Sequence, residues 1–178
     1  MRSVIVETER LRLREMTYDD ADAILAVFSD KDSVKYYPYE FNEERSRFWI
    51  FCNLKRYAVF SFGTWAVELK ETGELIGDCG LTMQMINKMT RPEIGYHMRK
   101  DQRGKGYAAE AARAVRDWAF ERTPFQIVYS YMKAENVASY KTAEAAGLRL
   151  IEEYTDEDGE LQKMYAITRE EWEKLKKA

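Results

Sequence analysis

The sequence predicts an α+β fold in which helices flank a mixed, mostly antiparallel sheet of about seven strands. The chain has 178 residues, of which 46% are apolar and 33% are charged. This length and this balance suit a single globular domain over residues 1–178. Hydrophobic periodicity gives the order strand, two helices, three strands, helix, strand, helix and two strands.

The N-terminal half supplies the first strand, two helices and a hairpin. Leucines alternate with arginines in residues 11–16, which predicts a strand. One helix is expected from Thr17, a residue type that caps helices, and another from near Asn42. Residues 60–69, rich in aromatic and β-branched side chains, and residues 75–85 predict a hairpin.

The middle of the chain predicts a strand, a loop, a helix and a second strand. Residues 93–98 and 127–132 have the composition of strands. Between them, residues 106–121 predict an amphipathic helix. Its apolar side consists of Ala108, Ala111, Ala112, Val115, Trp118 and Ala119, and its polar side of Glu110, Arg113, Arg116 and Asp117.

The C-terminal part predicts a short helix, a closing hairpin and a terminal helix. Asn136 is suited to begin the short helix and Gly147 to end it. Residues 148–154 and 161–167 alternate as paired strands do. Thr168 begins a capping-box pattern that predicts the last helix.

Composition excludes several classes of function. The net charge is −3 and no run of lysine or arginine exceeds two residues, so no nucleic-acid partner is expected. Two distant cysteines, expected as free thiols, and one histidine give little material for a metal site, so no metal is expected. Charge appears too early for a signal peptide and no apolar run could span a bilayer. We therefore expect a cytoplasmic protein without a membrane partner.

Glycines and cations fill the loop before the helix at 106–121. The loop reads Arg103-Gly104-Lys105-Gly106-Tyr107-Ala108. Glycines let a ligand approach the backbone, and the first amides of a helix have no internal acceptor, so such a loop can hold an anion. It matches neither the Walker nor the Rossmann pattern. A plain tight turn with two surface cations is the alternative interpretation.

Several segments, in order, resemble the GNAT superfamily of N-acetyltransferases. Arg103-x-x-Gly106-x-Ala108 resembles its Arg/Gln-x-x-Gly-x-Gly/Ala motif. The segments that begin at Glu93, Gly106 and Asn136 are similar to those of the RimJ/RimL-type branch, which acetylates the N-termini of ribosomal proteins. The other matching segments are Thr8-Glu9-Arg10-Leu11-Arg12-Leu13-Arg14, Trp65-Ala66-Val67-Glu68 with Leu75-Ile76-Gly77, Glu93-Ile94-Gly95-Tyr96, Gly106-Tyr107-Ala108-Ala109-Glu110-Ala111, and Asn136-x-x-Ser139 with Glu144-x-x-Gly147-Leu148.

This resemblance implies the GNAT fold and acetyl-CoA as the cofactor. The strands at 93–98 and 127–132 would run parallel and splay apart, and the pantetheine arm would satisfy the backbone groups in the gap. The diphosphate would lie on the amides from Arg103 to Ala108. The resemblance further implies cofactor contacts from His97, Met98 and Asn136. Asn136 has the alternative role of a plain helix cap.

Acetyl transfer to nitrogen requires a base that removes a proton from the amine. Glu93 is the first candidate, because the resemblance places it on the strand that would hold the thioester. Glu68, on the neighbouring hairpin, is a weaker alternative. His97 shares a strand face with Glu93 by the two-residue period, so it could relay a proton or serve a structural role.

The departing thiolate requires a proton or a hydrogen bond. Many members of the family place a tyrosine seven residues after the asparagine of the short helix, but this chain has Ala143 there. The RimJ/RimL branch instead resembles this chain in its serine at the position of Ser139, which makes Ser139 the candidate acid. Tyr140 is the fallback acid.

The acceptor is expected to be a primary amine, either a peptide N-terminus or a small amine such as a polyamine, an amino acid or an aminoglycoside. The resemblance places it in a groove built from the first two helices and the closing hairpin. Aromatic residues that could shape this groove, or simply pack in the core, are Tyr36, Tyr37, Tyr39, Phe41, Phe48 and Trp49. A non-catalytic acyl-CoA-binding module is the alternative function, and a homodimer is left open.

Overall fold

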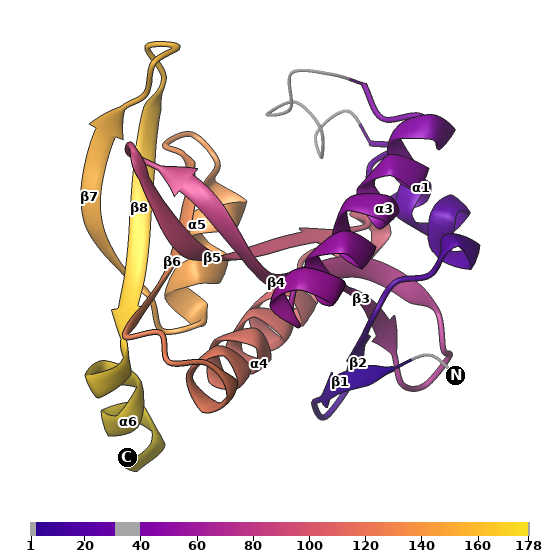
Figure 1. The fold of residues 1–178 in the computed structure, drawn as a ribbon, viewed down its shortest axis with the longest axis horizontal. Helices are drawn as coiled ribbons and strands as arrows, with labels where there is room; N and C mark the ends of the chain where they lie inside the picture. Colours follow the sequence, from indigo (N-terminus) through magenta and orange to yellow (C-terminus); the bar gives the residue numbers. More distant parts are fainter. Residues whose placement is uncertain (1–2, 31–39, 178) are drawn as a thin grey trace.

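The structure, a computed structural model, describes residues 3–30 and 40–177. Within these residues eight strands form one sheet in the order β1-β2-β3-β4-β5-β6-β8-β7. Every neighbouring pair is antiparallel except β5 and β6, which are parallel. The predicted α+β fold with a mixed, mostly antiparallel sheet is confirmed, with one strand more than expected (Figure 1).

The additional strand lies at the N-terminus, where β1 pairs with β2. The hairpin strand expected from residue 60 starts later, because α3 continues to Phe60 and ends at Ser61, whose φ is 62°. Phe60, Phe62 and Thr64, on either side of this helix end, have strand-like side chains, so composition alone places the boundary too early. The elements of this half are β1 (Val4–Glu7), β2 (Leu11–Arg14), η1 (Tyr18–Asp20), α1 (Ala21–Val27), α3 (Glu43–Phe60) and β3 (Thr64–Leu69).

The second half contains a long hairpin and the strand–loop–helix unit. Asn87 and Lys88 form its two-residue turn with φ of 46° and 63°, the left-handed pair that closes tight hairpins. The elements are β4 (Leu75–Ile86), β5 (Met89–Met98), η2 (Lys100–Gln102), α4 (Tyr107–Arg122), β6 (Ile127–Lys133), α5 (Val137–Ala145), β7 (Arg149–Thr155), β8 (Leu161–Thr168) and α6 (Arg169–Lys177). None of the helices in the described ranges is both long and apolar enough to cross a membrane.

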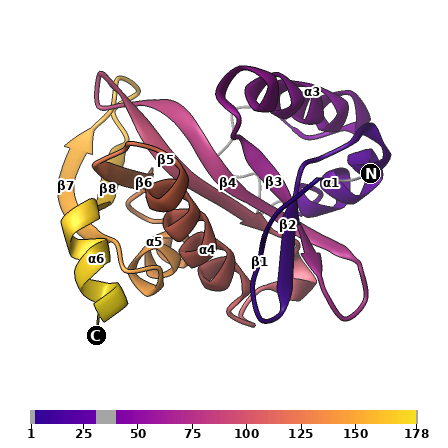
Figure 2. The ribbon, with the colours of Figure 1, turned by 60° about the horizontal axis from the view of Figure 1, so that its bottom comes forward.

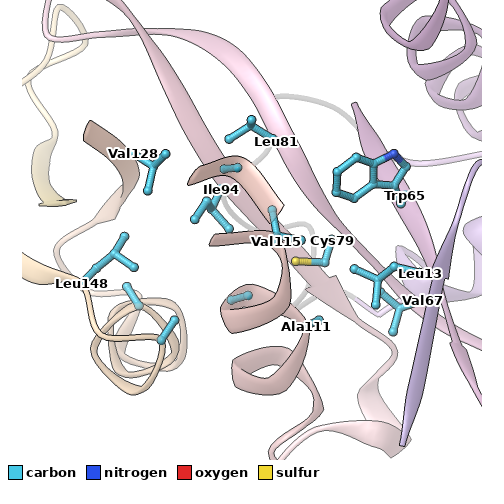
Figure 3. Close-up of a cluster of buried hydrophobic side chains, with 14 of the residues drawn as sticks. Leu13, Trp65, Val67, Cys79, Leu81, Ile94, Ala111, Val115, Val128 and Leu148 are labelled. Carbon is cyan, nitrogen blue, oxygen red and sulfur yellow. The ribbon is translucent and has the colours of Figure 1, made fainter. Parts of the chain in front are cut away.

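Helices cover the sheet on both faces. The alanine-rich side of α4 packs on β3, β4 and β5, with Ala111 and Val115 against Cys79 and Ile94 (Figure 3). On the opposite face, α1 and α3 form a second cluster around Ile24 (Figure 2). The predicted apolar side of α4 is confirmed, but Arg116 of its predicted polar side is buried, because its guanidinium donates to the Ala146 carbonyl at the end of α5.

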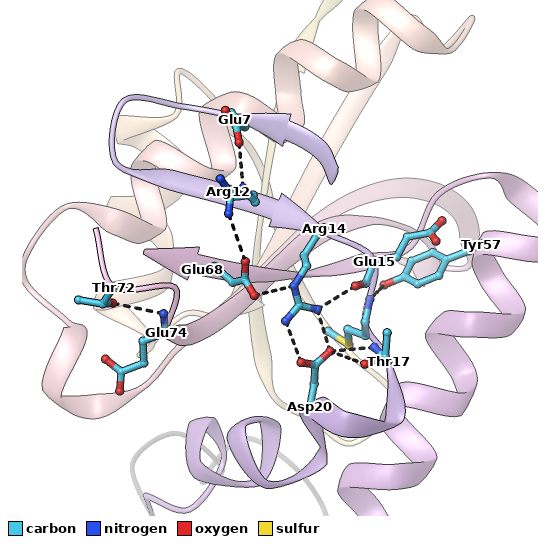
Figure 4. Close-up of polar contacts among 11 residues, drawn as sticks. Glu7, Arg12, Arg14, Glu15, Thr17, Asp20, Tyr57, Glu68, Thr72 and Glu74 are labelled. Carbon is cyan, nitrogen blue, oxygen red and sulfur yellow. Dashed lines mark hydrogen bonds and ion pairs between the residues drawn. The ribbon is translucent and has the colours of Figure 1, made fainter. Parts of the chain in front are cut away.

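A buried ion cluster joins the N-terminal strands to the first helix (Figure 4). Arg14 on β2 donates to both carboxylate oxygens of Asp20, at 2.7 and 2.8 Å, and to Glu68 on β3 at 2.7 Å. Removing one partner from such a buried cluster typically costs about 3–5 kcal/mol. Glu68, the weaker alternative base, is thus committed to a structural ion pair.

Candidate active site

The parallel strands β5 and β6 separate almost as soon as they meet. Their only paired position among the described residues is Glu93 with Tyr129. Beyond Glu93, β5 continues to Met98 and leads through η2 into α4. The predicted splay is therefore present, and it leaves main-chain groups of β5 without a strand partner.

Strand parity shows which main-chain groups face this gap. The amide of Arg99 donates to the Ile76 carbonyl on β4 at 2.8 Å. Alternate residues of a strand direct their main-chain groups to the same neighbour, so His97 is turned towards β4, while Tyr96 and Met98 are turned towards β6. Of the two predicted contacts on this strand, Met98 therefore offers its backbone to the gap and His97 does not.

The loop between β5 and α4 presents a row of unused amides. Gly104 and Gly106 have φ of 74° and 83°, and Gly106 is the N-cap of α4. Within the described residues no protein acceptor bonds the amides of 104–109, and the first helical bond runs from Glu110 to Gly106. A Cβ at Gly104 would meet nothing within 4 Å. This geometry fits a diphosphate.

Arg103, expected to add its amide and charge to this site, is engaged elsewhere. Its amide donates to the Lys100 carbonyl at 3.3 Å. Its guanidinium donates to the Met98 carbonyl at 3.0 Å and pairs with Asp30 at 3.2 Å. The expected row of donors therefore starts at Gly104, and the Lys105 ammonium, which bonds Gln102, is the nearer cation on the loop.

The N-terminal hairpin clamps the loop from outside. Arg10 donates to the Lys105 carbonyl at 3.0 Å and lies over the ring of Tyr107 at 4.5 Å. Glu110, in the first turn of α4, accepts from Arg10 and from the hydroxyl of Thr8. These contacts join the turn between β1 and β2 to the loop and to the first turn of α4.

A cluster of hydroxyls crosses the gap on the side of α5. Tyr96 donates to the Ser139 carbonyl at 2.7 Å, and the Ser139 hydroxyl lies 3.4 Å from the Tyr96 oxygen. Ser130, buried on β6, lies 3.5 Å from the same oxygen. Burial raises the pKa of Tyr96 to about 12, so the phenol stays protonated at neutral pH.

The other residues predicted on this helix occupy structural positions. Asn136 caps α5 by accepting from the Ser139 amide at 3.2 Å, so the capping role of Asn136 is present. Tyr140 stacks on Tyr165 with ring centres 6.4 Å apart and has Lys163 above its ring. The structure therefore brings Ser139 to the gap and turns Tyr140 towards β8.

Glu93 lies on the other face of β5, on the side of α1 and α3. Its carboxylate accepts from the Thr82 hydroxyl at 3.2 Å. Burial raises the pKa of Glu93 to about 7, although Thr82 and the charges of His97 and Arg56 oppose the rise. A carboxylate that is half ionised at neutral pH is suited to accept and release a proton.

No side chain occupies the strand position next to this carboxylate on the same face. Gly95 follows Glu93 on the same strand face, and the nearest atoms to a Cβ built on Gly95 belong to the Glu93 carboxyl group, at 3.7 Å and beyond. A larger residue at 95 would contact the Glu93 carboxyl group. The glycine thus keeps this part of the strand face free of a side chain.

His97 is held in a buried polar contact rather than in the gap. Its Nδ1 lies 2.6 Å from Asp78, whose other oxygen accepts from the Trp49 indole at 2.8 Å. The ring also packs against Phe28. Of the predicted aromatic group, Phe41 stacks on Phe28, Trp49 contacts His97 and Phe48 is exposed, while Tyr36, Tyr37 and Tyr39 lie outside the described residues.

The chain matches the acetyltransferase (GNAT) domain family over residues 10–149. It belongs to the GNAT acetyltransferase family. This acetyltransferase is 35% identical to YkkB of Bacillus subtilis over 79% of this chain and 83% of that protein. Among solved structures it is similar to a GNAT acetyltransferase from Bacillus anthracis, with a TM-score of 0.81, 26% identity and coverage of 96% and 99%. RimL with coenzyme A shares the fold, with a TM-score of 0.78, 19% identity and coverage of 93% and 98%.

As a GNAT member, the protein is an acetyl-CoA-dependent N-acetyltransferase. Its site includes groups that sequence reasoning did not select, chiefly Tyr96, Ser130 and Asp78. Tyr96 lies within a segment that matches the family, but only the structure shows its contact with Ser139 at the start of α5. In the described part of the chain, histidines, cysteines and acids form no cluster that could hold a metal ion.

Proposed function

We propose that this enzyme transfers acetyl from acetyl-CoA directly to a primary amine, with a protein N-terminal α-amine as the favoured acceptor. The observation that carries the proposal is Glu93, a carboxyl group with a pKa of about 7 next to the side-chain-free position of Gly95, on the strand that splays from β6. The acetyl-CoA thioester would supply the activated acyl group.

The protein residues would bind acetyl-CoA at two places. The amides of 104–108 would hold the diphosphate, as helix N-termini hold anions. The main-chain groups of Tyr96 and the amide of Met98 would bond the pantetheine arm, as an edge strand bonds an added strand. In this proposal Asn136 and His97 support the site through their side-chain contacts.

Glu93 would take the proton from the amine, and Ser139 would stabilise the leaving thiolate from the opposite face. An α-amine titrates near 8 and a lysine amine near 10.4, so a base of pKa about 7 is better matched to the α-amine. The amide of Tyr96, which faces the gap, is placed to stabilise the developing oxyanion. RimL, a ribosomal L7/L12 α-N-protein acetyltransferase, shares this fold.

The test is release of free thiol from acetyl-CoA in the presence of an amine panel, with mass spectrometry of the products. The panel contains a peptide with a free N-terminus, the same peptide blocked at its N-terminus but carrying lysine, a polyamine and an amino acid. We expect acetylation at an α-amine. Turnover only with small amines would favour the small-molecule alternative, and binding without any turnover would favour a non-catalytic acyl-CoA-binding module.

Substituting Ser139 with alanine should lower kcat by about a hundredfold, the lower end of the range of general acid–base catalysis. Acetyl-CoA affinity should change little, because the Ser139 carbonyl and amide keep their bonds to Tyr96 and Asn136. Stopped-flow turnover and calorimetry measure the two effects separately. Equal losses in kcat and in acetyl-CoA affinity would show that Ser139 has only a packing role.

A further inference from the structure

One side of α3 lines a groove with cations at both ends. Arg45, Trp49, Cys52 and Arg56 follow one another at helical spacing, which places them along a single stripe. The groove has a volume of about 180 Å³, and its lining residues are Phe41, Arg45, Phe48, Trp49, Cys52 and Arg56. None of these described residues is acidic, so the groove is aromatic and basic in a chain whose net charge is −3.

Two lining residues connect the groove to the candidate base. Trp49 packs edge-on against His97, with ring centres 5.9 Å apart, and His97 shares the β5 face with Glu93 and Gly95. The Arg56 Cβ lies beside Gly63, whose carbonyl accepts from the Leu81 amide, next to Thr82, which pairs with Glu93. The positive charge of Arg56 accordingly opposes the rise in the pKa of the Glu93 carboxyl group. The end of the groove at Arg56 therefore lies within electrostatic range of the proposed acetyl transfer.

Arg56 has no acidic partner in the described part of the chain. Its guanidinium donates to the side-chain oxygen of Asn53 at 3.2 Å, which is a neutral acceptor. Its Cβ lies against Gly63, so the base of the side chain is fixed where α3 turns into β3. A half-buried guanidinium with one neutral bond retains donors for a planar anion such as a carboxylate.

We propose that the acceptor carries a carboxylate near its amine, with the amine directed to Glu93 and the carboxylate to Arg56. This inference rests on the proposed function and narrows its acceptor. An amine and a carboxylate in one molecule complement the opposite charges of Glu93 and Arg56. The aromatic side chains of Phe48 and Trp49 line the groove beside Arg56. A polyamine, by contrast, would bring a second cation against Arg56.

Two sources of this chemistry differ in size, a free amino acid and a peptide whose second residue is acidic. The experiment uses both, each with a partner that differs only by replacing the carboxylate with an amide. The pairs are an amino acid and its amide, and peptides with Glu or Gln at position two. In at least one pair, kcat/KM for the carboxylate should exceed that for the amide by about tenfold or more.

Variants of Arg56 test the contact itself. The preference is the ratio of kcat/KM for the carboxylate acceptor to kcat/KM for its amide. Arg56→Gln should bring this ratio close to one without changing acetyl-CoA affinity, and Arg56→Lys should retain part of the preference. Arg47→Gln is the matched control, because Arg47 lies on the same helix, is exposed and pairs with Glu43. The control should keep the wild-type ratio.

The possible negative results distinguish an error in this inference from an error in the proposed function. Wild-type turnover at equal rates for acid and amide, or a preference that Arg56→Gln leaves intact, would overturn this inference and leave the proposed function standing. Absence of turnover with every acceptor, while CoA still binds, would overturn both.

Discussion

Gly106→Asp should reduce the affinity for CoA by at least about a hundredfold, the equivalent of losing two hydrogen bonds to a charged group. Gly106 has φ of 83° and caps α4 in the middle of the row of unused amides. Aspartate would strain this backbone, place bulk where the diphosphate approaches, and add a negative charge beside it. Isothermal calorimetry with CoA measures the loss.

Gly159→Asp is the matched control for this variant. Gly159 has φ of 82° and a Cβ there meets nothing within 4 Å, so the substitution adds the same charge and a similar strain in the β7–β8 turn. It should leave CoA affinity intact. If Gly106→Asp bound CoA as tightly as the wild type, the loop would not be the diphosphate site.

Glu93→Gln should lower kcat/KM by about a hundredfold or more, the usual contribution of a general base. In the wild type, activity requires the ionised carboxylate, so it should fall as the pH drops through about 7 and level off above that value. Glutamine cannot ionise, so the kcat/KM of the variant should not show this fall at low pH. Measuring kcat/KM from pH 5.5 to 9 tests both; this range brackets the pKa of about 7.

Stability provides a check that Glu93→Gln has not simply unfolded. Burial raises the pKa of Glu93 from its ordinary value of 4.5 to about 7, so the folded protein binds this proton more tightly than the unfolded chain does. Glu93 therefore contributes most stability below 4.5, and this contribution is lost as the pH rises through 7. Glutamine should make the protein more stable than the wild type at pH 9, by on the order of 2 kcal/mol. Two results would contradict the assignment of Glu93 as the base. One is a Glu93→Gln variant that is less stable than the wild type at pH 9, and the other is a variant whose kcat/KM still falls at low pH as the wild-type value does.

Sequence periodicity predicted the elements whose two faces differ strongly. The alanine-rich side of α4 and the capped start of α5 both appear where expected, because each depends on neighbouring residues. Phe60 shows the limit of this reasoning, since an aromatic residue at a boundary suits the end of α3 as well as the start of a strand. The short strand β1 is defined by its pairing with β2 rather than by its own pattern.

The candidate site could be predicted only in its local parts. The glycine loop and its helix form one continuous segment, so their geometry follows from spacing. Arg103 was assigned to the diphosphate because its tie to Asp30, more than seventy positions away, leaves no trace in local sequence. Tyr96 was overlooked for the same reason, since its role depends on a contact with Ser139 on another element.

Amide hydrogen exchange followed by NMR, with and without CoA, tests the central claim most directly, because it reports on each main-chain donor separately. We expect CoA to slow exchange at the amides of 104–108 and at Tyr96 and Met98 in the gap between β5 and β6. Gly159→Asp should show the same pattern. Binding of CoA that protects other amides, while those of 104–108 exchange at their unbound rates, would contradict the account.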